Sequence, residues 1–570
     1  MERKRKYLKY LSLLAVWAVV FAVFFAAAPD AQAENRDFIA ADGIVSVAHP
    51  LASQAGLEIL RKGGNAFDAA VAASFALGVA EPAASGIGGG GVAILYVAKE
   101  NKSYVVDFQD VGPAKANANV WPRDREGKIM NKAKRIGYLS VCVPGQARGM
   151  EVISQKFGSL AWADVLAPAV RLADEGLPVS GTLNSIIMES FSDMNLYPSG
   201  AFFERHFLEG GLPKSAGEVV RNTDLAKTLR KIAAGGADAV YKGEIADAIV
   251  KEFARPQAGG WITKEDMANY RVIIREPVVG SYRGYDVYLM PPPSAGVTVM
   301  QILNIMEGYE LGDKIAKDSG QFNHIFVEAQ KLAWADQDKY AGDPDFVRVP
   351  VKGMISKKYA DTQRKRINPA KAGPKATAGD PPADESASTT SFSIIDKEGN
   401  MITVTQTIGH FFGAGIVPPG TGILMNDHMD TFSQRASSPN APQGGKRVFS
   451  SIAGAILVKD GKPFLTLGSP GAARIISTVA QVIINVVDYR MNLQEAINAP
   501  RIHNRNAAAT YLEGGYPAAL TDELTARGHK ITVLGVHDLY FGGVQGAMYM
   551  PDGKLHGCAD PRRDGVAAGY

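Results

Sequence analysis

Cysteine is scarce in this sequence, with Cys142 and Cys558 the two among 570 residues. Two thiols cannot build a multi-disulfide scaffold or a four-thiolate zinc site, although one disulfide and two unpaired thiols both stay open. An excess of one charge is also nearly absent: the net charge is +3, and residues 1–33 carry all of it. Because the rest of the chain is formally neutral, composition gives no indication of a nucleic-acid partner.

Sequence motifs for bound cofactors are missing as well. There is no GxxxxGK[ST] loop and no GxSxG turn, and the nine histidines include no HxxxH pair. Gly86, Gly88 and Gly91 satisfy GxGxxG, but a helical pattern precedes them and a strand-like run follows, which is the reverse of a dinucleotide site. We therefore expect no cofactor and no metal in the chemistry. The glycines predict a backbone that passes close to another segment.

The N-terminus has the pattern of a secretory signal peptide over residues 1–33. A basic segment at 3–9 precedes an apolar run at 11–28, and Ala31-Gln32-Ala33 has the small-x-small form of a cleavage site. Cleavage predicts export, to the periplasm or outside the cell. Without cleavage the run would anchor the protein in a membrane, because its length approaches the span of a bilayer.

Hydrophobic periodicity predicts long helices early in the chain and strand pairs further on. The expected elements are helices at 52–80 and over much of 145–255, strands at 92–97 and 282–290, hairpins at 390–408 and 455–467, and a helix that opens at 468–471. Strand pairs and apolar helices in separate runs indicate an α+β fold with helix–sheet–sheet–helix layers, rather than strict βαβ alternation.

Residues 369–388 contain no large apolar side chain, which predicts a mobile linker. Order resumes at Thr389, where the first hairpin begins. Cleavage between Ser388 and Thr389 would give Thr389 a free α-amino group, with a pKa of about 8, beside its own hydroxyl. Such an amine can act as the base that activates the hydroxyl for attack on an acyl carbon. Backbone N–H groups at 468–472 would then stabilise the oxyanion.

Further motifs follow one another between residue 36 and the C-terminus. They are Ser85–Gly91, Val143-Pro144-Gly145, Tyr282–Tyr285, Met290–Ser294, Gly342–Phe346, Thr389–Ser393, Ser450-Ser451, Gly468–Gly471 and Asp560–Tyr570. In this order they resemble the gamma-glutamyltransferase (glutathione hydrolase) proenzymes, a family of N-terminal nucleophile hydrolases. The resemblance implies a four-layer αββα sandwich and self-cleavage before the Thr-Thr-x-[YF]-S motif that begins at Thr389.

The same resemblance implies how the chain is divided and what it acts on. A signal peptide at 1–33 precedes a large subunit at 34–388, which ends in the linker 369–388, and a small catalytic subunit at 389–570. The two fragments of one precursor stay associated. The substrate is a small molecule, glutathione or another γ-glutamyl or acyl amide, and the acyl group passes to water or to an amino-acid or peptide acceptor.

Four residues carry the catalytic roles that the resemblance implies. Thr389 is the nucleophile and the new N-terminus, and Thr407 hydrogen-bonds and orients it. Gly471 and Ala472 stand where two backbone N–H groups form the oxyanion hole. The family has Gly-Gly at this place, but alanine still donates its N–H. Ser450 and Ser451 match the serine pair that holds the donor's α-carboxylate.

The departures from the family concern substrate recognition. Gln109 replaces the arginine that pairs with the α-carboxylate of a γ-glutamyl group. In the family, the α-ammonium is held by an asparagine, by a glutamine or glutamate, and by an aspartate. This sequence has Gly409, His428 and Thr431 at these three positions, in that order. Asp430 is also a family position, with a structural role expected. The charges that could rebuild this clamp are Arg435, Arg447, Asp427 and Asp430.

Three functions are therefore compared. The first is an autoprocessing gamma-glutamyltransferase or glutathione hydrolase that forms a threonine acyl-enzyme. The second is a related acyl-amide hydrolase, an acylase or oxamate-type amidohydrolase, whose acyl group lacks the amino-acid head. The third is a non-catalytic exported binding protein, which the presence of Thr389, Thr407 and the Gly-Ser-Pro-Gly loop argues against. We favour the first.

Overall fold

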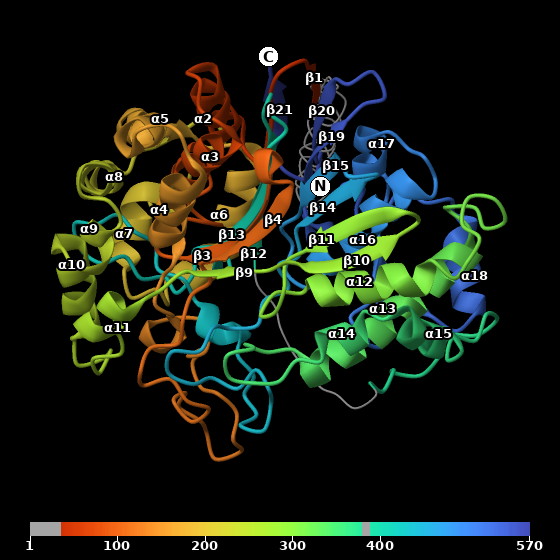
Figure 1. Cartoon of the computed structure of the whole chain (residues 1–570). Coiled ribbons are helices and arrows are strands. Elements are labelled where there is room, and N and C mark those ends of the chain that lie inside the picture. The colour runs from red at the N-terminus through yellow and green to blue at the C-terminus, as the bar shows by residue number, and fades with distance from the viewer. Residues whose placement is uncertain (1–35, 379–387) are drawn as a thin grey trace, which may run out of the picture. The chain divides into compact units, whose positions relative to one another are not determined.

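Two seven-stranded antiparallel sheets lie face to face between two layers of helices (Figure 1). The structure is a computed structural model that describes residues 36–378 and 388–570, with Ser388 and Thr389 as backbone. The predicted signal peptide and the end of the predicted linker, 379–387, lie outside the described residues. The four-layer αββα sandwich expected from the sequence is confirmed.

The first sheet contains the predicted hairpin that begins at the proposed cleavage site. Its strands, in spatial order, are β21 (Val566–Gly569), β2 (Ile44–Val47), β12 (Ser388–Ile395), β13 (Met401–Gly409), β3 (Gly90–Val97), β4 (Lys102–Asp107) and β9 (Ile273–Arg275). The β12–β13 hairpin therefore occupies the middle of the sheet, where strands cover it on both sides.

The second sheet carries the other predicted hairpin. Its strands, in spatial order, are β1 (Asp37–Ala40), β20 (Leu555–Ala559), β19 (Gln545–Tyr549), β15 (Lys462–Gly468), β14 (Ala455–Lys459), β11 (Tyr285–Leu289) and β10 (Val278–Tyr282). The strand predicted at 282–290 is shorter than expected. It is divided at the turn Arg283-Gly284, because both residues adopt positive φ, and Tyr282 ends the preceding strand.

Helices cover the outer face of each sheet. Those on the first side are α2 (Pro50–Arg61), α3 (Ala66–Ala80), α4 (Gln146–Phe157), α5 (Trp162–Glu175), α6 (Gly181–Met194), α7 (Gly200–Phe207), α8 (Thr223–Gly235), α9 (Asp238–Tyr241), α10 (Glu244–Phe253) and α11 (Lys264–Asn269). Those on the second side are α12 (Gly296–Met306), α13 (Gly320–Tyr340), α14 (Val351–Met354), α15 (Lys357–Arg364), α16 (Arg474–Val487), α17 (Leu493–Asn498) and α18 (Ala519–Ala526).

Helix α3 shows how the sequence specifies this packing. Asn65 caps its N-terminus by accepting from the backbone N–H groups of Phe67 and Asp68, and the Asp68 side chain accepts from the N–H of Asn65. Such a capping box satisfies backbone donors that a helix end otherwise leaves open. The helix that follows is alanine-rich and almost wholly buried, so it packs closely on β12 and β13.

The glycine run before β3 is required by close packing. A Cβ at Gly89 would collide with the carbonyl oxygen of Thr407, and one at Gly91 with that of Thr405. Both collisions are with the backbone of β13, the neighbour of β3. The close approach predicted from the glycines is therefore confirmed, and it brings β3 against the strand that carries Thr407.

The two cysteines are free thiols, so the disulfide alternative is wrong. Cys142 belongs to the core between the first sheet and its helices, and Cys558 to the core between the second sheet and its helices. Burial raises the pKa of both thiols well above the ordinary value. Neither residue is therefore placed or activated to act as a nucleophile.

The start of the predicted linker is held against the body of the protein. The N–H of Ala372 donates to the carbonyl of Arg527 at 2.7 Å, and the N–H of Ala376 donates to Oδ1 of Asn506 at 2.7 Å. Both partners come from the region after Thr389. Residues 369–378 are thus tied to the C-terminal part of the chain.

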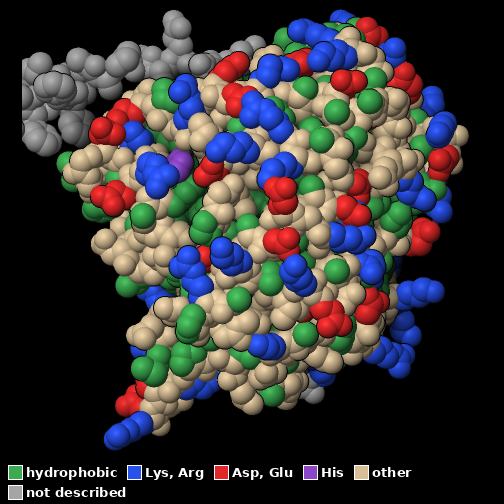
Figure 2. Space-filling view, turned by 90° about the vertical axis from the view of Figure 1, so that its left-hand side faces the viewer, with side chains coloured by type: hydrophobic (Ala, Val, Ile, Leu, Met, Phe, Trp, Pro, Cys, Tyr) green, Lys and Arg blue, Asp and Glu red, His purple; other side chains and the backbone are tan. Residues whose placement is uncertain are grey.

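The exposed surface agrees with the nearly neutral composition. On the face in Figure 2, Lys and Arg side chains are interspersed with Asp and Glu side chains rather than gathered by sign. Among the described residues, no helix combines the length and the apolar character needed to cross a bilayer.

Candidate active site

The predicted nucleophile lies at the start of β12, at an irregular point of the β12–β13 ladder. Ser388 pairs with Gly409 and Thr390 with Gln406, so one extra residue is accommodated on the β13 side. The side chain of Thr389 lies outside the described residues. Its backbone stands opposite the end of β13, where Thr407 is found. This register brings the proposed cleavage point and Thr407 to the same end of the central hairpin.

A small cavity opens beside this end of the hairpin. Seven of the residues predicted for the site line it: Gln109, Thr407, His428, Thr431, Ser450, Ser451 and Ala472. They come from segments that are far apart in the sequence, after β4, on β13, in the 428–431 turn, before β14 and before α16. The fold therefore assembles most of the predicted site around one cavity.

Thr407 is fixed by the backbone of its own strand end. The N–H of Gly409 donates to Oγ1 of Thr407 at 2.9 Å, so the hydroxyl oxygen of Thr407 is held in place as an acceptor. The side chain is buried at the cavity wall. This arrangement fits a residue that orients a neighbouring hydroxyl group.

The Gly471-Ala472 pair has the backbone geometry of an anion-binding turn. Gly471 has φ +124° and Ala472 has φ +54°, a left-handed conformation that costs a non-glycine residue about 1–2 kcal/mol. Within the described part of the chain, no acceptor is found for the N–H group of either residue. Strain and open donors together are typical of a functional turn. Helix α16 begins slightly later than predicted, at Arg474, because this turn precedes it.

Gln109 is buried in the cavity wall with an open hydrogen-bonding group. Its Nε2 donates to Oγ of Ser294 at 3.4 Å, whereas its Oε1 has no partner among the described residues. An unsatisfied buried amide oxygen costs about 1–3 kcal/mol, which a ligand can recover. Gln109 can therefore contact a substrate, but it brings no positive charge to the position of the family arginine.

His428 and Asp110 form a buried ion pair at the cavity. Nδ1 of His428 lies 2.5 Å from Oδ2 of Asp110, and Asn426 donates to Oδ1 of Asp110 at 3.2 Å. Burial lowers the pKa of His428, but the Asp110 carboxylate outweighs this effect, so the pKa lies above its ordinary value. Burial raises the pKa of Asp110. Both shifts favour the protonated forms, and a protonated imidazole of His428 can donate a hydrogen bond to an anionic group of a ligand.

Gly409 does not line the cavity, and no side chain fits there. A Cβ at Gly409, which has φ +98°, would collide with Oδ1 of Asp427. That carboxylate accepts from the backbone N–H of His410 at 2.8 Å, and its Oδ2 lies 2.6 Å from Nδ1 of His410. Asp427 thus fills the space that the family's amide side chain would need.

Three of the four charged residues that could rebuild the clamp are paired with other residues of the chain. Asp430 lies 3.6 Å from Nζ of Lys134, and Asp427 binds His410. Nε of Arg447 lies 3.4 Å from Oδ1 of Asp107. None of them is among the described residues that line the cavity, and Arg435 is exposed on the surface.

Sequence reasoning missed three residues that support the site. Asp110 pairs with His428, Ser294 contacts Gln109, and Glu81 accepts from Oγ1 of Thr390 at 2.5 Å. Burial raises the pKa of Glu81. Asp110 directly follows Gln109, and Ser294 ends the Met290–Ser294 motif. Proximity to residues already singled out in the sequence could therefore have indicated both. Glu81 lies in no such motif, and only the fold brings it to β12.

Replacing His428 with glutamine is expected to change the pH dependence of turnover. A group whose pKa is raised stays protonated at lower pH and loses its proton as the pH rises through that pKa. Binding of an anionic substrate group should therefore weaken at alkaline pH in the wild type. In His428→Gln the fall of kcat/KM at alkaline pH should disappear, while the rise expected if the α-amine of Thr389 is the base should remain. An unchanged pH profile would show that His428 does not contact the substrate.

Comparisons with known proteins agree with this geometry. The sequence model of the gamma-glutamyltranspeptidase family matches residues 52–570. The glutathione hydrolase proenzyme of Escherichia coli is 38% identical, over 93% of this chain and 92% of that protein. The acylase ACY 1 proenzyme of Pseudomonas sp. strain SE83 is 39% identical, over 94% and 95%. The crystal structure of cephalosporin acylase from Bacillus halodurans superposes with a TM-score of 0.86 at 32% identity, over 95% and 98%.

Proposed function

The chain belongs to the gamma-glutamyltranspeptidase family of N-terminal nucleophile hydrolases, and we propose that it is an autoprocessing glutathione hydrolase and gamma-glutamyltransferase. It cleaves itself between Ser388 and Thr389 and then hydrolyses γ-glutamyl amides or transfers their acyl group. The observation that carries this proposal is the single cavity at the start of β12, around which seven of the predicted residues gather.

The chemistry follows from the groups at that cavity. Thr389 Oγ attacks the carbonyl carbon of the amide while its α-amine accepts the proton. The N–H groups of Gly471 and Ala472 stabilise the oxyanion, and Thr407 orients the attacking hydroxyl. The amide bond breaks, the amine leaves with a proton, and an ester remains on Thr389. Water or an amine acceptor then takes the acyl group and regenerates the hydroxyl.

A second candidate function is supported by the charges around the cavity. Neutral Gln109 and Thr431 stand where the family places an arginine and an aspartate, and the nearby charged residues are engaged elsewhere. A protonated His428 can donate to a carboxylate, but among the described residues that line the cavity the acid is Asp110, which is already paired with His428. An amide whose acyl group carries a carboxylate without the α-amine, such as a glutaryl amide, fits this charge pattern. The acylase relatives support the same alternative.

An activity panel distinguishes the two candidates. Fully processed enzyme would be assayed with glutathione, a glutaryl amide and oxamate, with release of the amine or ammonia as the measured product. Glutathione as the substrate with the highest kcat/KM supports the γ-glutamyl activity. A clear preference for the glutaryl amide or for oxamate would replace it with the acylase or amidohydrolase function.

Replacing Thr407 with valine is expected to lower kcat by about 10- to 100-fold. The substitution keeps the shape of the side chain but removes the oxygen that accepts from Gly409, and a buried donor left without a partner costs about 1–3 kcal/mol. Thr407→Ser keeps the hydroxyl and is the matched control. Steady-state kinetics on processed enzyme measure both. Equal activity of the valine variant and wild type would exclude an orienting role.

Export is proposed on the basis of the N-terminal sequence alone. Residues 1–33 carry the basic segment, apolar run and cleavage motif of a signal peptide. A mature protein that begins at Glu34 and is recovered outside the cytoplasm would agree with it. Recovery of the uncleaved chain in the membrane fraction would favour the anchored alternative.

A further inference from the structure

A cluster of metal-ligating side chains lies outside the catalytic cavity. His324, Glu328 and His529 are all buried, and one ligand atom from each lies within 4.8 Å of the others. The closest pair is Nδ1 of His324 and Nε2 of His529, 2.8 Å apart. None of the three residues lines the cavity described above. The cluster is therefore separate from the proposed chemistry.

The elements of the second helical layer bring these residues together. His324 and Glu328 are four residues apart on α13, so their side chains share one face of the helix. His529 stands in the turn between α18 and β18 (Lys530–Val533), and α18 packs on α13. Three side chains from two packed segments thus meet at one point inside the protein.

The hydrogen bonds define which histidine nitrogens can bind an ion. Nε2 of His324 lies 2.7 Å from the carbonyl oxygen of Asn368. A carbonyl only accepts, so His324 carries its proton on Nε2 and offers a lone pair at Nδ1. His529 then donates from Nε2 to that lone pair. A backbone carbonyl on the far nitrogen of an imidazole is the arrangement that orients metal-bound histidines in proteins.

Glu328 supplies the third group. Its Oε1 accepts from Nζ of Lys331 at 2.8 Å, and Lys331 also donates to the carbonyl of Gly373 at 2.7 Å. The described residues provide no hydrogen bond to Oε2. One carboxylate oxygen is therefore available, although the ammonium of Lys331 competes electrostatically with a cation.

We propose that Nδ1 of His324, Nε2 of His529 and the Glu328 carboxylate form a binding site for a divalent transition metal ion of the zinc class. Two imidazole nitrogens and one carboxylate are a ligand set that zinc uses, with water completing the tetrahedron. When the ion binds, the proton of His529 moves from Nε2 to Nδ1, so the ring stays neutral and no net proton is released. The two nitrogens must separate by about half an ångström to accept Zn–N bonds of about 2.0–2.1 Å.

The position of the site gives it a structural role. His324 and Glu328 precede the Ser388–Thr389 bond, and His529 follows it. If the chain is processed as proposed, the ion connects the large fragment to the small one. That consequence depends on the proposed processing, whereas metal binding itself does not. The two proposals can therefore fail separately.

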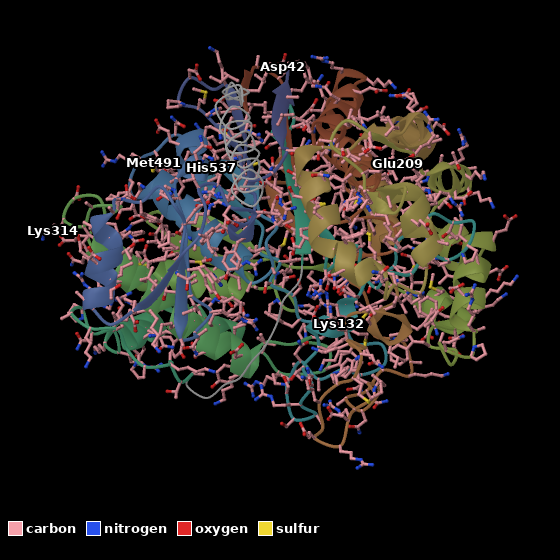
Figure 3. All side chains as sticks on the ribbon, turned by 180° about the vertical axis from the view of Figure 1, so that it is seen from behind. Asp42, Lys132, Glu209, Lys314, Met491 and His537 are labelled. Atoms are coloured by element: carbon pink, nitrogen blue, oxygen red, sulfur yellow. The ribbon has the colours of Figure 1, made fainter. Side chains whose placement is uncertain are left out.

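Zinc titration of the full-length mature protein tests the site. Calorimetry should show saturable binding of one zinc ion per chain, and zinc should raise the thermal unfolding midpoint. Glu328→Gln and His529→Gln should each weaken binding by about tenfold or more, since even an outer-shell partner of a metal ligand is worth about 10–100-fold. The control is His537→Gln, which replaces an exposed histidine outside the cluster, labelled in Figure 3.

Glu328→Gln preserves the size of the side chain, so it keeps the test meaningful if His529→Gln fails to fold. Lys331→Met removes the competing ammonium and should change the affinity in the opposite direction, towards tighter binding. The proposal is overturned if wild type shows no saturable zinc binding. It is also overturned if both ligand variants bind zinc as tightly as wild type and as His537→Gln.

Discussion

Replacing Thr389 with alanine leaves a single uncut chain that has lost its amidase activity. The alanine has no hydroxyl to attack the preceding peptide bond, so Ser388 stays joined to residue 389. It also has no group that can form an acyl-enzyme. Loss of a nucleophile costs on the order of 10⁶ in kcat in well-studied hydrolases, so residual turnover should be undetectable in an ordinary assay. Denaturing electrophoresis and intact mass measure the processing, and amine release measures the activity.

Thr389→Ser is the matched control for this prediction. Serine keeps a hydroxyl next to the α-amine, so the chain should still be cut into fragments 34–388 and 389–570 and retain activity. The account fails if Thr389→Ala is cut at the same bond. Cleavage would then depend on another group, and Thr389 would not be the processing nucleophile.

Introducing Gln109→Arg together with Thr431→Asp is expected to raise kcat/KM for glutathione by about tenfold or more. The two residues line the same cavity and would supply counter-charges for the carboxylate and the ammonium of a γ-glutamyl group. Tenfold corresponds to about 1.4 kcal/mol of transition-state binding. The double variant keeps Gly409 rather than the asparagine of the family, because a side chain at position 409 would collide with Asp427.

The same double variant should lose activity on a glutaryl amide. Without the amino group of the substrate, the new carboxylate at 431 would be buried and unpaired, which is costly. Each single variant serves as a control, and each protein must be fully processed before assay. If wild type already turns over glutathione efficiently and the double variant is no better, other residues hold the amino-acid head.

The local parts of the fold could be predicted from the sequence. The two central hairpins, the alanine-rich helix α3 and the glycine run can each be recognised from a short stretch of neighbouring residues. The pairing of β1 with β20 and of β2 with β21 could not be predicted, because it joins the two ends of the described chain without a local signal. The strand predicted at 282–290 is too long at its start, because the apolar pattern continues through a turn at Arg283-Gly284.

In the candidate site, too, the sequence indicates individual residues but not the contacts between distant segments. Ser450 and Ser451, which form a recognisable motif, and Ala472, which directly follows the Gly468–Gly471 motif, line the cavity. Burial lowers the pKa of His428 and Asp110 raises it, and the contact between the two depends on how the segment after β4 meets the 428–431 turn. The obstruction of position 409 by Asp427 likewise follows from a positive φ and a neighbouring loop. Motifs therefore locate residues of the cavity, while tertiary packing sets the contacts among them.

Mass spectrometry of the small fragment during turnover tests the central claim most directly. Processed enzyme would be mixed with excess substrate, quenched in acid and digested. The account predicts a peptide that begins at Thr389 and carries the mass of the acyl group, which disappears when the substrate is exhausted. A small fragment that begins at another residue, or an acyl adduct on any other side chain, would contradict it.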